Sequence, residues 1–370
     1  YVYRSELAIR RLGGPRYKRQ LLTGARALAE GFALADGDLE PWRALSAFYG
    51  PEGVPADVPG VVEQQVVAAL NAYVAGQAAR AKGLLESALV TARAARGGSL
   101  MVALVMNGAA HASVWLKDFE AGKNLRSRVL QGIRPLQLPK LTVLIVRQMV
   151  SAHLAEKNID DLTGYTRELR ESGDVVLGDT RAVKVLTTSA DTLDAEARQR
   201  VKDGRLAGAV RCIREATALW AVLAQPKVIA IDHLSTQSES VRRARVSRQA
   251  EMLRLEGQVA ARRGQFEEAR ALYEQAIGLY DGLGDASGAA VIETDLAEAL
   301  LSSGDADRAI VRTAASQKRV GLQGNPQARA RNYLIQVRAR RTQGRLAKAY
   351  GNVNYALQVL RDGGQADEAK

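Results

Sequence analysis

The chain has 370 residues, of which 47% are hydrophobic and 25% charged, and this composition excludes a chain that is disordered throughout. The formal net charge is +12, so the partners it favours are anionic: acidic peptides, phosphates or acidic lipid headgroups. The sequence contains no run of 18 apolar residues, so no segment is predicted to span a membrane. The single Cys212 excludes both a disulfide framework and a multi-cysteine zinc site. A chain with one thiol fits the cytoplasm, which is the predicted compartment, and fits the periplasm equally well.

Residues 1–225 are predicted to form degenerate helical hairpins. Gly76 opens one unit, and alanines and a leucine follow it at helical spacing. A second unit begins at Lys117, 41 residues later, and a weaker one begins at Asn158, 41 residues after that turn. Gly204 opens a further unit, again with alanines at helical spacing after it. These segments therefore resemble one another in pattern more than in residue type.

Residues 226–249 break this register. Gly204 lies 60 residues before the equivalent Gly264, whereas the units after Gly264 repeat every 40 residues. The excess contains Pro226 and the polar run Ser235–Ser240, and several arginines follow. We interpret residues 226–249 as a linker that leads into an extended first helix.

Residues 250–370 repeat with a period of 40 in four columns, and this repetition is the strongest signal in the sequence. Each unit has a turn glycine, a small residue five positions later, a second small residue seven positions after that, and a closing glycine. The columns are Gly264, Gly304 and Gly344; Ala269, Ala309 and Ala349; Ala276, Ser316 and Ala356; and Gly284, Gly324 and Gly364.

These columns predict helical hairpins. A turn glycine permits the left-handed conformation that ends a first helix, and small residues let the second helix lie close to it. No single hairpin can bury its apolar face alone, so each must stack on its neighbours. The predicted fold is therefore all-α: a right-handed α-solenoid of stacked helical hairpins. Gln365–Lys370 resembles the beginning of another helix, so either a continuation of the repeats or an attached effector domain is expected after Lys370.

One unit resembles the tetratricopeptide repeat in the order and spacing of its signature residues. These residues are Gly257, Gly264, Phe266, Ala269, Tyr273 and Ala276. The next two units depart from the pattern, since Gly257 becomes Ala297 and then Val337, and Tyr273 becomes Thr313 and then Val353. The family's closing proline is missing. The lengthened units are similar to those in sensor arms of bacterial signalling proteins and large transcription regulators.

The resemblance implies a concave groove lined by the first helices, in which partner proteins or peptides bind. By register with the family pattern, the groove residues are Arg254, Gln258, Arg262, Glu298, Arg331, Arg338 and Arg341. Glu298 is the only acidic residue in this set, so the groove is predicted to be cationic and its ligand acidic. Asp295 stands where chaperone-binding members carry an asparagine, and this departure counts against chaperone binding.

A basic segment near the C-terminal end accounts for the whole net charge. Twelve basic residues and no acidic residue lie between positions 308 and 361. They are Arg308, Arg312, Lys318, Arg319, Arg329, Arg331, Arg338, Arg340, Arg341, Arg345, Lys348 and Arg361. Nucleic-acid binding is therefore a competing hypothesis, although the segment has only three tyrosines to stack on bases and no helix-turn-helix signature.

No catalytic, metal or cofactor pattern is present. His111, His153 and His233 lie too far apart in sequence for a helical metal motif, and packed histidines explain them better. Cys212 stands in an apolar helix, which favours an inert buried thiol. We therefore predict no catalytic residue, no metal, no cofactor and no enzyme. The first hypothesis is a protein- or peptide-binding regulatory module, and the second is a sensor that encloses a small molecule or signal peptide.

Overall fold

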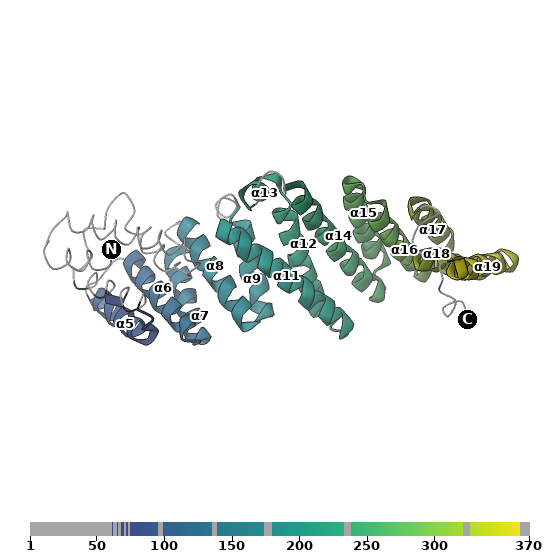
Figure 1. The fold of residues 1–370 in the computed structure, drawn as a ribbon. Helices are drawn as coiled ribbons and strands as arrows, with labels where there is room; N and C mark the ends of the chain where they lie inside the picture. The colour runs from purple at the N-terminus through teal and green to yellow at the C-terminus, as the bar shows by residue number, and fades with distance from the viewer. Residues whose placement is uncertain are drawn as a thin grey trace. The chain divides into compact units, whose positions relative to one another are not determined.

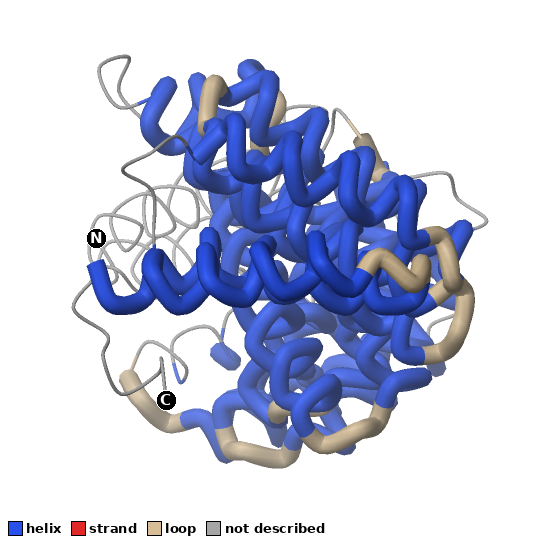
Figure 2. The backbone as a smooth tube through the Cα atoms, turned by 90° about the vertical axis from the view of Figure 1, so that its right-hand side faces the viewer, coloured by secondary structure: helices blue, strands red, loops and turns tan. Residues whose placement is uncertain are grey.

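The computed structural model describes residues 75–94, 99–134, 139–173, 180–232, 238–320 and 326–362, with isolated positions between 61 and 72. This part of the chain contains fourteen helices and no strand (Figure 1, Figure 2), so the all-α prediction is confirmed for it. The helices are α5 (Ala78–Ala94), α6 (Ser99–Trp115), α7 (Phe119–Ile133), α8 (Pro139–Glu156), α9 (Ile159–Glu171), α11 (Thr180–Lys202), α12 (Leu206–Leu223), α13 (Pro226–Asp232), α14 (Ser238–Arg262), α15 (Phe266–Leu283), α16 (Ala286–Ser302), α17 (Ala306–Val320), α18 (Pro326–Thr342) and α19 (Leu346–Asp362).

The chain divides into two units, Tyr1–Val176 and Leu177–Lys370. In the first unit α6 packs on α7 and α8 on α9, while α5 packs on α6 and α7 on α8. The buried residues of these helices are mainly Ala, Leu, Val, Ile and Met, as expected for a chain with few aromatic residues. Helices of this unit therefore pair as hairpins and then stack on the adjacent hairpin.

The second unit repeats the same arrangement. Its hairpins are α11–α12, α14–α15, α16–α17 and α18–α19, and successive hairpins meet through α12 and α14, α15 and α16, and α17 and α18. Residues Pro226–Asp232 form α13, which packs against α11, α12 and α14. The sequence division at residues 225 and 250 stays a prediction. The stacked helical hairpins themselves are confirmed within each unit.

The turn inside each hairpin holds one residue in the left-handed region. Gly264, Gly304 and Gly344 have φ values of 76°, 92° and 71°, which confirms the predicted turn column. Glycine is favoured there because its missing Cβ removes the clash that other residues meet at positive φ. Two turns of the first unit use lysine instead: Lys117 has φ 64° and Lys157 has φ 58°. The closing glycines Gly324 and Gly364 lie outside the described residues.

Replacing Lys117 or Lys157 with glycine is expected to raise the free energy of unfolding by about 0.5–1 kcal/mol each. The left-handed conformation costs a non-glycine residue about 1–2 kcal/mol, and the greater freedom of glycine in the unfolded chain offsets part of that gain. Chemical denaturation measures the change. The reciprocal Gly264→Lys should lower stability by about 1 kcal/mol. If the denaturation midpoints of all three variants equalled that of the parent, these residues would not occupy the same turn position.

The small residues of the two repeated columns are buried in the second helix of each hairpin. Ala269, Ala309 and Ala349 are buried, and so are Ala276, Ser316 and Ala356. At the equivalent level of the first helix, a Cβ added to Gly257 would lie 2.8 Å from Cε1 of Tyr273. The tetratricopeptide-like pair of a glycine and an aromatic residue is therefore one packing unit in this chain.

Candidate functional site

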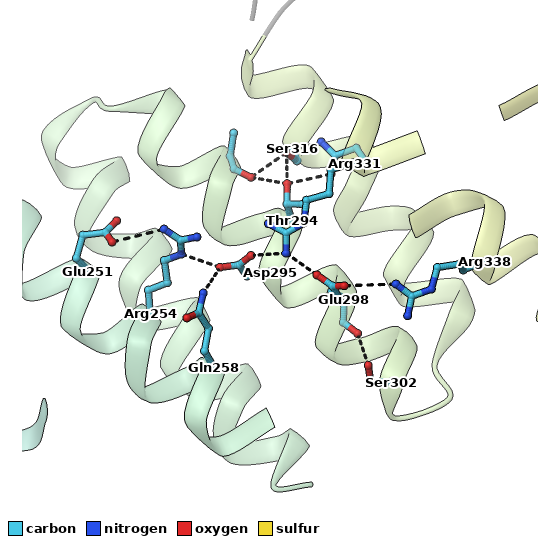
Figure 3. A network of polar contacts seen from close by, with 12 residues as sticks. Glu251, Arg254, Gln258, Thr294, Asp295, Glu298, Ser302, Ser316, Arg331 and Arg338 are labelled. Carbon is cyan, nitrogen blue, oxygen red and sulfur yellow. Dashed lines mark hydrogen bonds and ion pairs between the residues drawn. The ribbon is translucent and has the colours of Figure 1, made fainter. Parts of the chain in front are cut away.

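The residues predicted to line a groove lie on the first helices of three successive hairpins. Helix α14 carries Arg254, Gln258 and Arg262, α16 carries Glu298, and α18 carries Arg331, Arg338 and Arg341. Helix α14 contacts α16, and α16 contacts α18, so the three first helices lie side by side. Five of the seven residues interact directly or through one shared acid, as Figure 3 shows.

The shared acid is Asp295, which is almost fully buried on α16. Nε of Arg254 lies 2.6 Å from its Oδ2, and Nε2 of Gln258 donates to the same oxygen at 3.0 Å. Nη2 of Arg331 lies 3.0 Å from Oδ1 (Figure 3). One carboxylate on the middle helix therefore ties together cations from the helices on both sides.

The ion pairs continue in both directions from Asp295. Nη2 of Arg331 also pairs with Oε2 of Glu298, whose Oε1 lies 3.3 Å from Nη1 of Arg338. On the other side, Nη1 of Arg254 lies 3.5 Å from Oε2 of Glu251. Charges of opposite sign thus alternate across the three helices (Figure 3). We call Glu251, Arg254, Asp295, Arg331, Glu298 and Arg338 the charge row.

The charge row corrects one expectation. Glu298 is not the only acid among these cations, because Asp295 lies between Arg254 and Arg331 and forms an ion pair with each. The expected cationic groove is therefore neutralised along much of its length. Sequence reasoning noted Asp295 only as a departure from the family pattern, and the two arginines that bind it lie 41 and 36 residues away.

The same contacts keep the arginines charged. Burial by itself would lower the pKa of Arg254, but Asp295 and Glu251 outweigh it and raise that pKa above its usual value. Burial also acts to lower the pKa of Arg331, but Glu298 and Asp295 outweigh it and raise that pKa above its usual value. Each guanidinium is therefore fully protonated at any pH that the fold tolerates.

Arg262 and Arg341 stand apart from the charge row. Both are exposed, and neither forms an ion pair with a residue that the structure describes. Leu334, one turn from Arg331 on α18, is 48% exposed, and Arg338 is 56% exposed in spite of its contact with Glu298. The exposed face of α18 therefore offers cations around an apolar side chain.

A second group of ion pairs involves the second helices. Nη2 of Arg312 lies 2.8 Å from Oε1 of Glu274, and Nη1 lies 3.4 Å from Oε2 of the buried Glu293. Arg319 pairs with Asp281 and also approaches Glu293. Burial raises the pKa of Glu293, although Arg312 and Arg319 act to lower it. Acids of α15 and α16 thus neutralise cations of the basic segment.

Buried side-chain hydrogen bonds join the last hairpins. Oγ1 of Thr294 lies 2.9 Å from Oδ1 of Asn332, whose Nδ2 donates to Oγ of Ser316 at 2.9 Å. Nε2 of Gln336 donates to Oγ1 of Thr313 at 2.9 Å. Such bonds favour one register between α16, α17 and α18, because a slip would leave buried polar atoms unpaired.

Among the described residues, no group of three His, Cys, Asp or Glu side chains could hold a metal ion. Cys212 is buried on α12, as predicted. His153 is buried on α8 and stacks on Tyr165, with ring centroids 5.2 Å apart. The side chain of His111 and the whole of His233 lie outside the described residues. None of the described helices is long and apolar enough to cross a membrane.

Replacing His153 with phenylalanine is expected to weaken the loss of stability on acidification. Burial lowers the pKa of His153 below its ordinary 6.5, and Lys123 acts in the same direction, while Asp161 and Glu156 oppose it. Below about pH 6.5 the unfolded chain therefore binds a proton that the folded chain refuses, and folding stability falls as pH drops toward the lowered pKa. Urea unfolding at about pH 7.5 and about pH 5.5 tests this, and phenylalanine keeps the stack on Tyr165. If the parent and the variant lost the same folding stability between these two pH values, His153 would not be the group responsible.

No protein-family model matches the chain, and no curated protein matches it in sequence. Solved structures similar to it include a tetratricopeptide repeat protein from Parabacteroides merdae, with 10% identity and a TM-score of 0.34 over 84% of this chain and 98% of that one. The Cut9–Hcn1 hetero-tetramer of APC/C has 15% identity and a TM-score of 0.35 over 96% and 89%. The TPR2AB domain of yeast Sti1 in complex with pHSP90 has 13% identity and a TM-score of 0.28 over 79% and 99%. At these scores the likeness supports no argument about partner or mechanism.

Proposed function

We propose that the first helices α14, α16 and α18 form a protein-binding face that takes an acidic segment of a partner, with α18 as the main contact. The observation that carries this proposal is the exposed face of α18. Arg331, Leu334, Arg338 and Arg341 recur on it at intervals of three and four residues, which places them on one side of a helix. The partner's carboxylates would meet the guanidinium groups and an apolar side chain would meet Leu334.

The charge row decides which cations are available. Arg254 is mostly buried and bonded to Asp295, so an incoming carboxylate would have to displace an internal one. Arg338 contacts Glu298 through Nη1 and its side chain is 56% exposed, while Arg341 has no described ion-pair partner. A planar guanidinium suits a carboxylate in two-point contact. We therefore assign binding to Arg338 and Arg341 and a positioning role to Arg254.

The same reasoning favours an acidic protein segment over a nucleic acid. At least four of the twelve basic residues in segment 308–361, Arg308, Arg312, Arg319 and Arg331, form ion pairs with acids of this chain, in addition to the contact of Arg338 with Glu298. A nucleic-acid site depends on many cations that are free to contact successive phosphates. Binding of an acidic protein segment would suit a regulatory protein that recruits a partner. The experiment below distinguishes it from binding of a nucleic acid.

The test uses the double variant Arg338→Glu with Arg341→Glu. The probe is a fluorescein-labelled acidic peptide selected on the parent protein from a randomised display library. We expect the Kd to rise at least about tenfold, equal to about 1.4 kcal/mol, and the affinity of the parent to fall with salt. Fluorescence anisotropy measures both effects, and circular dichroism checks that the variant is folded.

The matched control is Arg345→Glu with Lys348→Glu. These residues are also exposed, carry the same charge, and lie at the turn and on α19 rather than on the exposed face of α18. The control should keep the parent's affinity. Equal losses in both variants would mean that only net charge matters. Tighter binding of a labelled single-stranded oligonucleotide, lost equally in both variants, would support nucleic-acid binding and overturn the proposal.

A further inference from the structure

Buried polar side chains line the junction between the hairpin α16–α17 and the hairpin α18–α19. Nδ2 of Asn332 donates to Oγ of Ser316 at 2.9 Å, and Nε2 of Gln336 donates to Oγ1 of Thr313 at the same distance. Thr294 donates to Oδ1 of Asn332 at 2.9 Å, and its hydroxyl lies 3.0 Å from that of Ser316 (Figure 3). All five side chains are buried. We call Thr294, Thr313, Ser316, Asn332 and Gln336 the polar seam.

The preceding junction is apolar at the same positions. Three residues of the polar seam have apolar equivalents 40 residues earlier: Tyr273 for Thr313, Ile292 for Asn332 and Leu296 for Gln336. These three are buried in one hydrophobic cluster of α14, α15, α16 and α17, to which no described residue of α18 or α19 belongs. The buried cluster of α18 and α19 contains Ala330, Ala356 and Leu360. One junction is therefore held by apolar packing, and hydrogen bonds take its place at the next.

Separation of the two hairpins has a different cost at each junction. Water can replace the hydrogen bonds of the polar seam, so the net contribution of each bond to the closed state is small. At the preceding junction, separation would expose Tyr273, Ile292 and Leu296 to water, which gives apolar side chains no compensation. The apolar residues buried on α18 are Ala330, Ile335 and Ala339, and two of these are alanines. The second unit is therefore expected to open at the polar seam first.

Ion pairs also cross the polar seam, and they are partly exposed. Arg331 pairs with Asp295 and Glu298 of α16. Arg338 pairs with Glu298 as well. The side chains of Arg331 and Arg338 are 46% and 56% exposed, so water screens these pairs and their contribution is modest. The ion pairs favour the closed arrangement without preventing its opening.

We propose that the polar seam is a hinge, at which α18 and α19 move together away from α16 and α17. The moving hairpin stays paired, because its helices share a buried cluster and Tyr333 stacks on Tyr355 with ring centroids 5.6 Å apart. Opening also takes Arg331 and Arg338 away from the acids of α16. If the function proposed above holds, the open form therefore binds an acidic segment more tightly, and the hinge regulates the face of α18.

Thiol accessibility tests the hinge with a matched pair of variants. Ser316→Cys places a thiol in the polar seam, and Ala276→Cys places one at the equivalent position of the preceding junction. Cys212, which is buried on α12, is an internal reference in both proteins. Peptide mass spectrometry follows alkylation by iodoacetamide without denaturant, and circular dichroism checks the fold. We expect the thiol at position 316 to react at least about a hundredfold faster than those at positions 276 and 212.

An apolar seam should hold the hinge closed. This variant adds four changes to Ser316→Cys: Thr313→Val, Asn332→Leu, Gln336→Leu and Asn352→Leu. The last is included because Nδ2 of Asn352 donates to Oε1 of Gln336 and would otherwise lose its partner. We expect alkylation at position 316 to slow at least about tenfold. If the apolar variant does not fold, the comparison of positions 316 and 276 decides by itself.

Gly351→Ala in α19 is the control for the apolar seam. No atom lies within 4 Å of the added Cβ, so this change stabilises the helix and leaves the polar seam as it is. It should not slow alkylation at position 316. An equal effect of Gly351→Ala and the apolar seam would mean that unfolding of the helices exposes the thiol, which would overturn the hinge. Alkylation at position 316 no faster than at position 276 would overturn it too.

The acidic peptide selected on the parent protein tests the regulation. It should speed alkylation at position 316, and the apolar seam should raise its Kd, because coupling between binding and opening acts in both directions. Unchanged alkylation with the peptide bound would mean that the face of α18 binds without opening, which would overturn the regulation. A protein that binds no acidic peptide would contradict the proposed function, whereas faster alkylation at position 316 than at position 276 would still support the hinge.

Discussion

Replacing Asp295 with asparagine is expected to lower the free energy of unfolding by about 2–3 kcal/mol. Breaking a buried ion pair by removing one charge typically costs about 3–5 kcal/mol, because the remaining charge stays buried without compensation. The cost is smaller here because the side chain of Arg331 is 46% exposed and can be hydrated, whereas that of Arg254 is 23% exposed. Urea unfolding of the parent and the variant measures the difference.

Glu298→Gln is the matched control for this prediction. Glu298 also pairs with two arginines, Arg331 and Arg338, but its side chain is 38% exposed. Ion pairs at this exposure contribute about 0–1 kcal/mol, so the control should lose much less stability than Asp295→Asn. Equal losses would mean that burial does not set the strength of the charge row. An unchanged Asp295→Asn protein would mean that Asp295 does not hold α14 and α18 to α16.

Replacing Gly257 with alanine is expected to lower the free energy of unfolding by about 2–3 kcal/mol. The new Cβ would lie 2.8 Å from Cε1 and 3.0 Å from Cδ1 of Tyr273. Tyr273 is buried, so its ring cannot move into solvent without exposing apolar surface. Gly278→Ala in α15 is the control, since no atom lies within 4 Å of the added Cβ. The control should gain up to about 1 kcal/mol from helix propensity.

The neighbouring hairpin supplies a compensating change. At the equivalent positions it pairs Ala297 with Thr313 in place of Gly257 with Tyr273. Tyr273→Thr alone leaves a cavity and should cost about 3–5 kcal/mol. Because it also removes the ring that the new Cβ meets, the double variant should be at least about 1 kcal/mol more stable than the sum of the two single changes predicts. Additive effects would show that the two positions do not form one packing unit.

Local patterns in the sequence were sufficient to predict the hairpins of the second unit. A turn glycine acts through its own backbone, and so Gly264, Gly304 and Gly344 have the predicted left-handed conformation. In the first unit Lys117 and Lys157 adopt this conformation without glycine. These turns were still predicted, because they continue the register at intervals of 41 residues. The structure adds that Asp118 and Asn158 cap the helices that follow, where their side chains accept hydrogen bonds from backbone N–H groups.

The candidate site was predicted only in part. Family register placed Arg254 on the first helix α14 and Arg331 and Arg338 on the first helix α18, and both helices contact α16. The register did not reveal that Asp295 lies between the arginines. Helical periodicity assigns a residue to a face of its own helix, but which side chains meet across two helices depends on the distance and rotation between them.

The amino-acid sequence by itself determined the all-helical class, the 40-residue period and the placement of the hairpin turns, because these follow from the conformational preferences of residues close together in the chain. Only the tertiary structure decided which charges are neutralised and which surfaces stay open. The acids that neutralise Arg312, Arg319 and Arg331 lie on earlier helices, so a basic run in the sequence becomes a set of ion pairs in the fold. Likewise Tyr273 of α15 is buried against residues of neighbouring helices, whereas Tyr350 of α19 is exposed, and the tyrosine residue type does not distinguish the two.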